Sequence, residues 1–206
     1  VSISDGKILT TLTDYNGQIA CGLDIISRIN YARGRKRLAE LRWRVLNTIN
    51  RLIAEALRSG GIEKDHLCSA FISGNTTMIH LLLGLNPEYI RIAPYTPTIL
   101  EVPDMTASAV GLDMHPEAVV SFSPAVGSYV GGDITAGILC TDLVTETEDI
   151  NIFIDLGTNG EVVVGNRDFL MACACSAGPA FEGGGIKDGM RAARGAIEKV
   201  DIDAET

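Results

Sequence analysis

Hydrophobic residues recur three and four positions apart through the first third of the chain and predict its longest helix over residues 35–58. This spacing places apolar side chains on one face of a helix. The face comprises Leu38, Leu41, Val45, Ile49, Leu52, Ile53 and Ala56. Gly60 and Gly61 end the pattern, and a shorter helix is expected before it, over residues 22–34.

The other apolar runs are short and rich in β-branched residues, which is typical of strands. They predict strands over residues 67–72, 118–122, 152–156 and 161–165, a hairpin of two short strands within residues 3–13, and short helices over residues 78–83 and 134–139. Five prolines between Pro87 and Pro116 exclude long regular elements there and predict an irregular excursion over the core. Mixed helices and strands indicate an α/β protein.

Composition narrows the class of protein. The chain has 206 residues, of which 46% are hydrophobic, and a net charge of −9. The acidic balance disfavours non-specific binding to nucleic acid, and no apolar run approaches the length of a membrane span, so a cytoplasmic protein is expected. Five cysteines without a zinc or disulfide spacing are expected to be reduced thiols, with Cys173 and Cys175 buried on one face of a strand.

A hairpin around a Gly-Thr-Asn-Gly turn is the first candidate site. Asp155 is expected at the open end of a buried strand, directly before Gly157, Thr158, Asn159 and Gly160. Glycines let backbone N–H groups approach an anion, and a carboxylate beside bound phosphate can hold Mg²⁺ through water. An ordinary hairpin in which Asn-Gly only makes the turn explains the pattern equally well.

Two further polar corners have both a structural and a functional interpretation. Asn75 or Thr76 is placed to cap the helix over residues 78–83, yet a strand-to-helix corner can also meet a ligand. Asp133 is placed as the N-cap of the helix over residues 134–139, or as a carboxylate acting on a Mg²⁺-bound or attacking water. His80 lies in an apolar helix and is expected to be packed rather than catalytic.

Positive charge is concentrated in one part of this acidic chain. Residues 28–58 contain nine arginines and lysines, namely Arg28, Arg33, Arg35, Lys36, Arg37, Arg42, Arg44, Arg51 and Arg58, against Glu40 and Glu55. A solvated helix face and a docking face for an acidic partner both fit this pattern.

Several motifs in order resemble one known family. They are GLDIISRINYA, GNTTMIHLLLG, APYTP, VGGD, FIDLGTNGEVVVGN and ACSAGPAFEGGGIKDGMRA. They are similar to the reductive activators of corrinoid proteins, including the RACo type and the activating enzymes of O-demethylases and methylamine methyltransferases. The resemblance implies the fold of the ASKHA superfamily: two ribonuclease-H-like α/β lobes of the actin and acetate-kinase type, incomplete in this chain.

The resemblance also implies a function. Such activators use ATP and Mg²⁺ to help pass one electron to a corrinoid protein of a methyltransferase system, returning its cobalt from Co(II) to Co(I). The electron comes from a [2Fe–2S] cluster in an N-terminal domain, and no plant-type cysteine pattern for such a cluster occurs in these residues. The full-length protein is therefore expected to be an ATP-hydrolysing enzyme.

The resemblance also implies which residues form the site. Asp155, Gly157, Thr158, Asn159 and Gly160 match the second phosphate loop of the superfamily, and Asp133 lies where an acid approaches Mg²⁺ and the γ-phosphate. A Gly-rich segment near the nucleotide is expected to contribute Ser176, Gly178, Gly183, Gly184 and Gly185, although a turn with packing glycines explains each single glycine equally well. No role is assigned to Glu161, Glu182 or Lys187.

The resemblance predicts most of a first lobe over residues 1–145 and the start of a second over residues 146–206. The first phosphate loop of the family is expected before Val1. We therefore expect an internal fragment that binds ATP weakly by itself and is prone to form a homodimer. Two alternatives for the full-length protein are a sugar- or acetate-type kinase on the same fold and a scaffold that binds its partner regardless of nucleotide.

Overall fold

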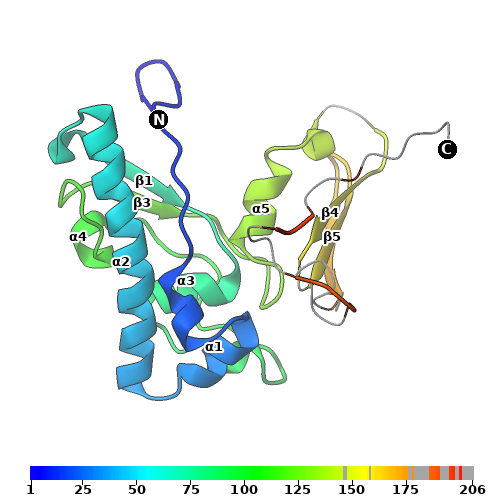
Figure 1. Cartoon of the computed structure of the whole chain (residues 1–206). Coiled ribbons are helices and arrows are strands. Elements are labelled where there is room, and N and C mark those ends of the chain that lie inside the picture. The colour runs from blue at the N-terminus through cyan, green and yellow to red at the C-terminus, as the bar shows by residue number, and fades with distance from the viewer. Residues whose placement is uncertain are drawn as a thin grey trace. The chain divides into compact units, whose positions relative to one another are not determined.

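A computed structural model describes residues 1–145, 148–157, 159–175, 178, 186–190, 195–197 and 200 (Figure 1). The chain divides into two compact units, Val1–Gly137 and Ile138–Thr206. The prediction of a division at residues 145 and 146 into two lobes remains a prediction. In the described part of the chain, no helix is both long enough and apolar enough to cross a membrane.

The first unit contains one long helix, several short ones and a small sheet. Its helices are α1 (Ile25–Tyr31), α2 (Arg35–Gly60), α3 (Thr76–Leu83), α4 (Ala107–Val110) and the start of α5 (Gly132–Ile138), with 3-10 turns η1 (Gly17–Cys21), η2 (Lys64–His66) and η3 (Glu88–Ile90). Its strands are β1 (Ser69–Ile72), β2 (Met105–Thr106) and β3 (Val119–Phe122), in the order β1-β3-β2. β1 runs parallel to β3, whereas β2 is antiparallel to it.

The core of this unit confirms the predicted apolar face of α2. Val45, Ile49 and Ile53 pack in one cluster with Ile79 and Leu82 of α3, with α4, and with Ala70, Ile72, Val120 and Phe122 of the sheet. Because side chains alternate along a strand, Phe71 and Val119 point to the other face of this sheet and are exposed. The sheet is therefore covered on one face only among the described residues.

The helix predicted over residues 22–34 needed adjustment, and one strand prediction was wrong. α1 is shorter than residues 22–34 because Asp24 caps it, accepting a hydrogen bond from the Ser27 backbone in a capping box. Residues 3–13 form no strand. Ser2 donates to the Lys7 carbonyl across a turn, but Ile8 and Leu9 remain exposed, so no buried face fixes the segment in a sheet.

The second unit contains a three-stranded antiparallel sheet. The 3-10 turn η4 (Asp142–Val144) precedes β4 (Asn151–Leu156), β5 (Gly160–Gly165) and β6 (Leu170–Cys175), in the order β4-β5-β6. The prediction that the Asp155 strand is buried was wrong: Ile152, Ile154 and Leu156 are 63%, 55% and 59% exposed. No described residue buries this face or β6. Cys173 and Cys175 of β6 are therefore exposed as well, against expectation.

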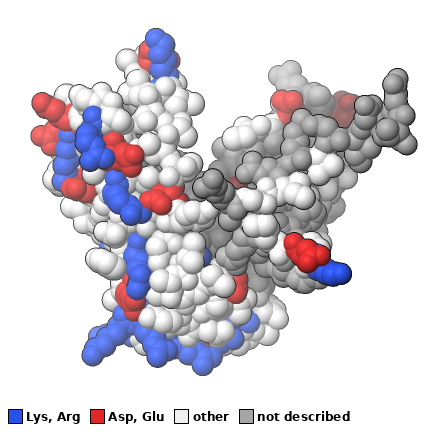
Figure 2. Space-filling view, in the orientation of Figure 1, with Lys and Arg blue, Asp and Glu red and all other residues white. Residues whose placement is uncertain are grey.

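Surface charge is distributed unevenly over the first unit. Figure 2 shows Lys and Arg side chains gathered at the end of the unit where the turn between α1 and α2 lies in Figure 1, whereas acids and bases alternate elsewhere on this face. The basic region predicted from sequence is therefore densest at the start of α2.

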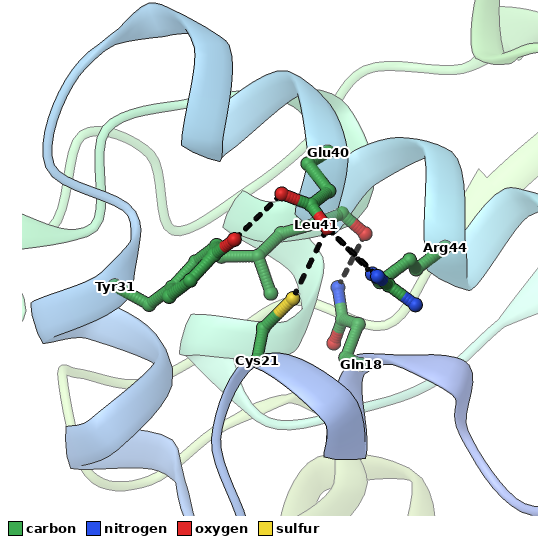
Figure 3. Close-up of polar contacts among 6 residues, drawn as sticks. All are labelled: Gln18, Cys21, Tyr31, Glu40, Leu41 and Arg44. Carbon is green, nitrogen blue, oxygen red and sulfur yellow. Dashed lines mark hydrogen bonds and ion pairs between the residues drawn. The ribbon is translucent and has the colours of Figure 1, made fainter.

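A polar cluster joins η1, α1 and α2 beneath that turn (Figure 3). Glu40 accepts a 2.6 Å hydrogen bond from the Tyr31 hydroxyl and two from the Arg44 guanidinium, at 3.0 and 2.8 Å. The carboxylate raises the pKa of Tyr31 to about 12, and the same hydrogen bond, with that of Arg44, lowers the pKa of Glu40. Nearby, the buried Gln18 side chain donates to the Leu41 carbonyl at 2.9 Å. These contacts fix α1 against α2.

Candidate functional site

The first candidate site lies at the carboxyl ends of β1 and β3, in the first unit. After β1 the chain turns through Ser73 and Gly74 into α3, and the Asn75 side chain accepts the Met78 N–H at 2.9 Å. Asn75, one of the two predicted caps, is therefore the N-cap of α3. In parallel sheets this edge is where ligands bind, so the corner has the position of a site as well as a structural role.

A loop that follows β3 packs directly on this corner. The Ser73 hydroxyl donates to the Gly132 carbonyl at 2.8 Å, and the Thr76 hydroxyl donates to the Gly127 carbonyl at 2.7 Å. A Cβ on Gly131 would lie 2.6 Å from the Asn75 Cα and 2.7 Å from the Thr76 nitrogen. Only glycine permits such a close approach of two backbones.

This packing brings Asp133 to the corner. α5 begins at Gly132, so Asp133 is the second residue of the helix and not the N-cap predicted for it. Its Oδ1 accepts the Ile134 N–H at 3.0 Å, and a Cβ on Gly131 would lie 2.7 Å from the same oxygen. The structure thus brings together Asp133 and the Asn75 corner, which the sequence identified separately.

Ser123 is a residue of this corner that the sequence analysis missed. It follows β3 directly, is only 6% exposed, and its hydroxyl has no hydrogen-bond partner. It lines a small pocket together with Thr76, His80 and Gly132. The rule that ligands meet the carboxyl ends of strands would have pointed to Ser123 as it pointed to Asn75.

His80 is packed, as predicted. It is 1% exposed, and its Nε2 accepts the Thr98 N–H at 3.0 Å while Nδ1 lies 2.7 Å from the Thr76 carbonyl. Since Nε2 is an acceptor, Nδ1 carries the proton and the ring is neutral. Burial lowers the pKa of His80, and this outweighs the opposite effect of the Thr76 carbonyl.

The second candidate site is the hairpin of β4 and β5 in the second unit. Asp155 pairs with Glu161 and Leu156 with Gly160, and the Gly157 N–H donates to the Asn159 carbonyl at 3.0 Å across the turn. Gly160 is buried and Asp155 is exposed. The predicted strand–turn–strand is confirmed around the residues assigned to the phosphate loop.

The strand register adds Glu161 to this site. Residues directly opposite in an antiparallel pair share one face with their Cβ atoms about 5 Å apart, so Asp155 and Glu161 present two carboxylates side by side. Like charges in such a pair are destabilising, whereas a divalent cation would neutralise them. The sequence analysis gave Glu161 no role, although counting the register across a three-residue turn would have paired it with Asp155.

The remaining predicted residues are not brought together by the described structure. Thr158, Ser176, Gly183, Gly184 and Gly185 lie outside the described residues, as does Glu182. Gly178 has a positive φ of 76°, and a Cβ there would meet nothing within 4 Å. Lys187 is exposed in a turn. No ligand role follows for either from its position.

Cys173 and Cys175 lie on one face of β6, where the predicted alternation places them. They pair with Val162 and Gly160 of β5, and their mutual contact raises the pKa of the Cys173 thiol. Within the described residues, no group of three or more histidine, cysteine or acidic side chains is placed to hold a metal ion. The cysteines of these residues therefore do not fit an iron–sulfur cluster, which needs four ligands.

Comparison with known proteins identifies the family. Residues 1–146 match the RACo middle region, and residues 149–206 match the C-terminal domain of RACo, the ASKHA domain. The chain belongs to the RACo family. A solved structure titled reductive activator for corrinoid, iron–sulfur protein is 51% identical, with a TM-score of 0.86 over 98% of this chain. The predicted α/β class and ASKHA relationship are thereby confirmed.

Two curated proteins are also similar to this RACo-family chain. The corrinoid activation enzyme RamQ of Eubacterium limosum is 36% identical over 98% of the chain. The [Co(II) methylated amine-specific corrinoid protein] reductase of Methanosarcina barkeri is 39% identical over 36% of the chain and 14% of its own length. The chain spans about a third of the length of RamQ and of the solved activator, 34% and 32% respectively.

Proposed function

We propose that this chain is the part of an ATP-dependent activator that carries one phosphate loop, and that the full-length protein reduces the cobalt of a corrinoid protein from Co(II) to Co(I). Family membership and the names of the relatives support the reaction class. The observation that carries the assignment of this chain's role is the hairpin in which Asp155 and Glu161 face one another beside a glycine turn.

The hairpin fits a Mg²⁺–phosphate group chemically. Two carboxylates with room for waters are the usual protein contribution to a Mg²⁺ site that is completed by substrate phosphates. When bound, Mg²⁺ would screen the negative charge of the phosphates. The turn of Gly157, Thr158, Asn159 and Gly160 would hold phosphate oxygens through its remaining donors, since the Gly157 N–H already donates to the Asn159 carbonyl.

We propose for Asp133 a separate task in the first unit. Its carboxylate lies at the N-terminus of α5 and beside the start of α3, where partial positive charge from helix N–H groups stabilises an anion. A carboxylate in this position can orient a water by accepting its proton as a hydrogen bond. We also propose that residues 1–145 form most of a first lobe.

The reduction adds one electron to cobalt and takes it from a donor that is oxidised by one electron. In keeping with the family resemblance, we propose a [2Fe–2S] cluster outside these residues as that donor and a methyltransferase system in the cytoplasm as the setting. For each 59 mV by which the reduction potential of the cobalt lies below that of the donor, the equilibrium constant of this one-electron step falls tenfold. Nucleotide can offset this only if it binds two states of the complex with different affinity.

The test uses the full-length protein with a Co(II) corrinoid protein and a reductant. Appearance of the Co(I) absorption band should require both ATP and Mg²⁺, and Asp155→Asn combined with Glu161→Gln should slow it at least tenfold. Phosphorylation of a sugar or of acetate would instead establish a kinase. Binding of the partner with equal affinity with and without ATP, and no Co(I), would establish a scaffold.

A further inference from the structure

A basic patch at the turn between α1 and α2 has no role in either candidate site. It consists of Arg33, Arg35, Lys36 and Arg37, all exposed, and it lies at the end of the first unit where Figure 2 shows Lys and Arg gathered. None of the four forms an ion pair with a described residue. In contrast, Lys7, Arg44, Arg51 and Lys64 each pair with a carboxylate.

The patch does not serve the stability of α2. Arg35, Lys36 and Arg37 are the first three residues of this 26-residue helix, and the first turn contains no acid. The N-terminus of a helix carries partial positive charge, so cations there are unfavourable. Gly34, the N-cap, contributes no side-chain hydrogen bond. The stability of α2 therefore does not account for the charges of Arg35, Lys36 and Arg37.

One residue of the patch, Arg37, contacts the polar cluster of Figure 3. The Arg37 guanidinium lies 5.3 Å from the centre of the Tyr31 ring, within range of a cation–π contact. Tyr31 is itself fixed by its hydrogen bond to Glu40, which Arg44 holds from the other side. A charged surface that is ordered before binding loses less conformational entropy on binding.

An exposed aromatic side chain lies along the same side of α2. Trp43 is the only tryptophan of the chain and is 61% exposed. It follows Lys36 by seven residues, two helical turns, so both side chains project from the same face. Tryptophan and arginine are the residues most enriched at the energetic centres of protein interfaces.

We propose that this basic patch and Trp43 form the docking surface for an acidic face of the corrinoid protein that the activator serves, an assignment that rests on the proposed function. The charge pattern selects a compact protein face over a long polyanion. A nucleic acid or an anionic membrane would extend over the rest of a chain whose net charge is −9, and would be repelled. A small acidic face would interact electrostatically with the patch and not with the rest of the chain, because charges beyond about 8 Å are largely screened at physiological salt.

The test compares two quadruple variants of the full-length protein. One carries Arg33→Gln, Arg35→Gln, Lys36→Gln and Arg37→Gln. The matched control carries Lys7→Gln, Arg51→Gln, Arg58→Gln and Lys64→Gln, exposed cations of the same unit. Both change net charge equally. Association with the corrinoid protein is followed from low to high salt. The patch variant should associate at least tenfold more slowly at low salt, with a shallower salt dependence, and the control should resemble the wild type.

Trp43→Ala gives an independent measurement, since loss of an aromatic anchor should accelerate dissociation about tenfold or more with little change in association. Equal effects of the two quadruple variants, or none from the patch variant, would overturn the proposal. So would patch-dependent capture of anionic vesicles or nucleic acid without binding of the corrinoid protein. Measuring the reduction of Co(II) at different concentrations of the corrinoid protein separates the proposed function from the docking proposal. If the wild type makes no Co(I) with ATP at saturating corrinoid protein, the proposed function fails. If the patch variant needs the same corrinoid protein concentration for half-maximal reduction as the wild type, only the docking proposal fails.

Discussion

The two candidate sites are built in opposite ways. At the corner of the first unit, the side chains of Ser73, Asn75 and Thr76 each form a hydrogen bond with the backbone, and backbone packs on backbone at Gly131. At the hairpin of the second unit, two carboxylates share one face of an otherwise apolar sheet, and Asp155 is exposed to water. One site is completed by packing, and the other places two acidic side chains on one face of a sheet.

This difference indicates which residues a ligand can act on. A corner held by short internal hydrogen bonds keeps its geometry whether or not a ligand is present, and it positions Asp133. A pair of like charges across a hairpin is stabilised when a cation arrives, so its energy depends on the ligand. We therefore expect changes at the corner to act on folding and changes at the hairpin to act on binding.

The largest effect should come from Gly131→Ala. The new Cβ would lie within 2.7 Å of backbone atoms of Asn75 and Thr76, so we expect a loss of about 3 kcal/mol or more in the free energy of unfolding. Urea denaturation of the chain, monitored by a signal from the unfolding of the first unit, measures this loss of free energy. Gly127→Ala in the same loop is the control, since its Cβ would meet nothing within 4 Å.

The hairpin counterpart of that change is Gly157→Ala, whose Cβ would touch only the Asn159 carbonyl at 3.5 Å. We expect stability to change by less than about 0.5 kcal/mol. If Gly157→Ala destabilises the chain as much as Gly131→Ala does, the contrast between the packed corner and the open hairpin is wrong.

An intermediate effect is expected from pH through His80. Its pKa is lowered in the folded protein, so the unfolded chain binds the proton more readily, starting near its ordinary value of 6.5. Stability should be constant above that pH and fall as pH drops below it, by at most about 1.4 kcal/mol per pH unit from this group. His80→Gln should be less stable at neutral pH but lose this part of the pH slope. An unchanged slope would mean that other groups cause it.

A small effect on stability, and the most selective one on binding, is expected at the carboxylate pair. Without a cation, Glu161→Gln should stabilise the second unit slightly, by about 0.2–1 kcal/mol, because it removes a like-charge neighbour of Asp155. Mg²⁺ should raise the unfolding midpoint of the wild type and not of the variant. Equal responses to Mg²⁺ in thermal unfolding curves would place the cation elsewhere. Na⁺ at matched ionic strength is the control for screening.

Local pattern was sufficient for the elements whose partners lie nearby. The apolar stripe of α2, the cap at Asn75, the packing of His80 and the turn at Gly157–Gly160 all follow from residues close in sequence. The strand predicted within residues 3–13 failed because a strand needs a neighbour, and that neighbour cannot be seen in the segment itself. The exposure of Ile152 and Ile154 was missed for a similar reason, since hydrophobicity shows what is suited to burial and not what covers it.

The tertiary features of the site were harder to predict. Ser123 and Asp133 meet the Asn75 corner only because Gly131 and Gly132 allow the loop to touch two strand ends. Glu161 required the strand register. In both cases the sequence indicated the chemistry of the side chain, whereas its neighbours depended on how distant segments pack.

The parallel pairing of β1 with β3 has a consequence for how the chain folds. Ser69 pairs with Val119, so the sheet of the first unit forms only after a long intervening segment, with its prolines, has been ordered. The hairpins of the second unit join neighbours across short turns. Because closing a long loop costs entropy before any contact rewards it, the later-synthesised strands should pair quickly, whereas the apolar face of α2 waits for β3. During synthesis that exposed helix face is the segment most in need of protection from aggregation.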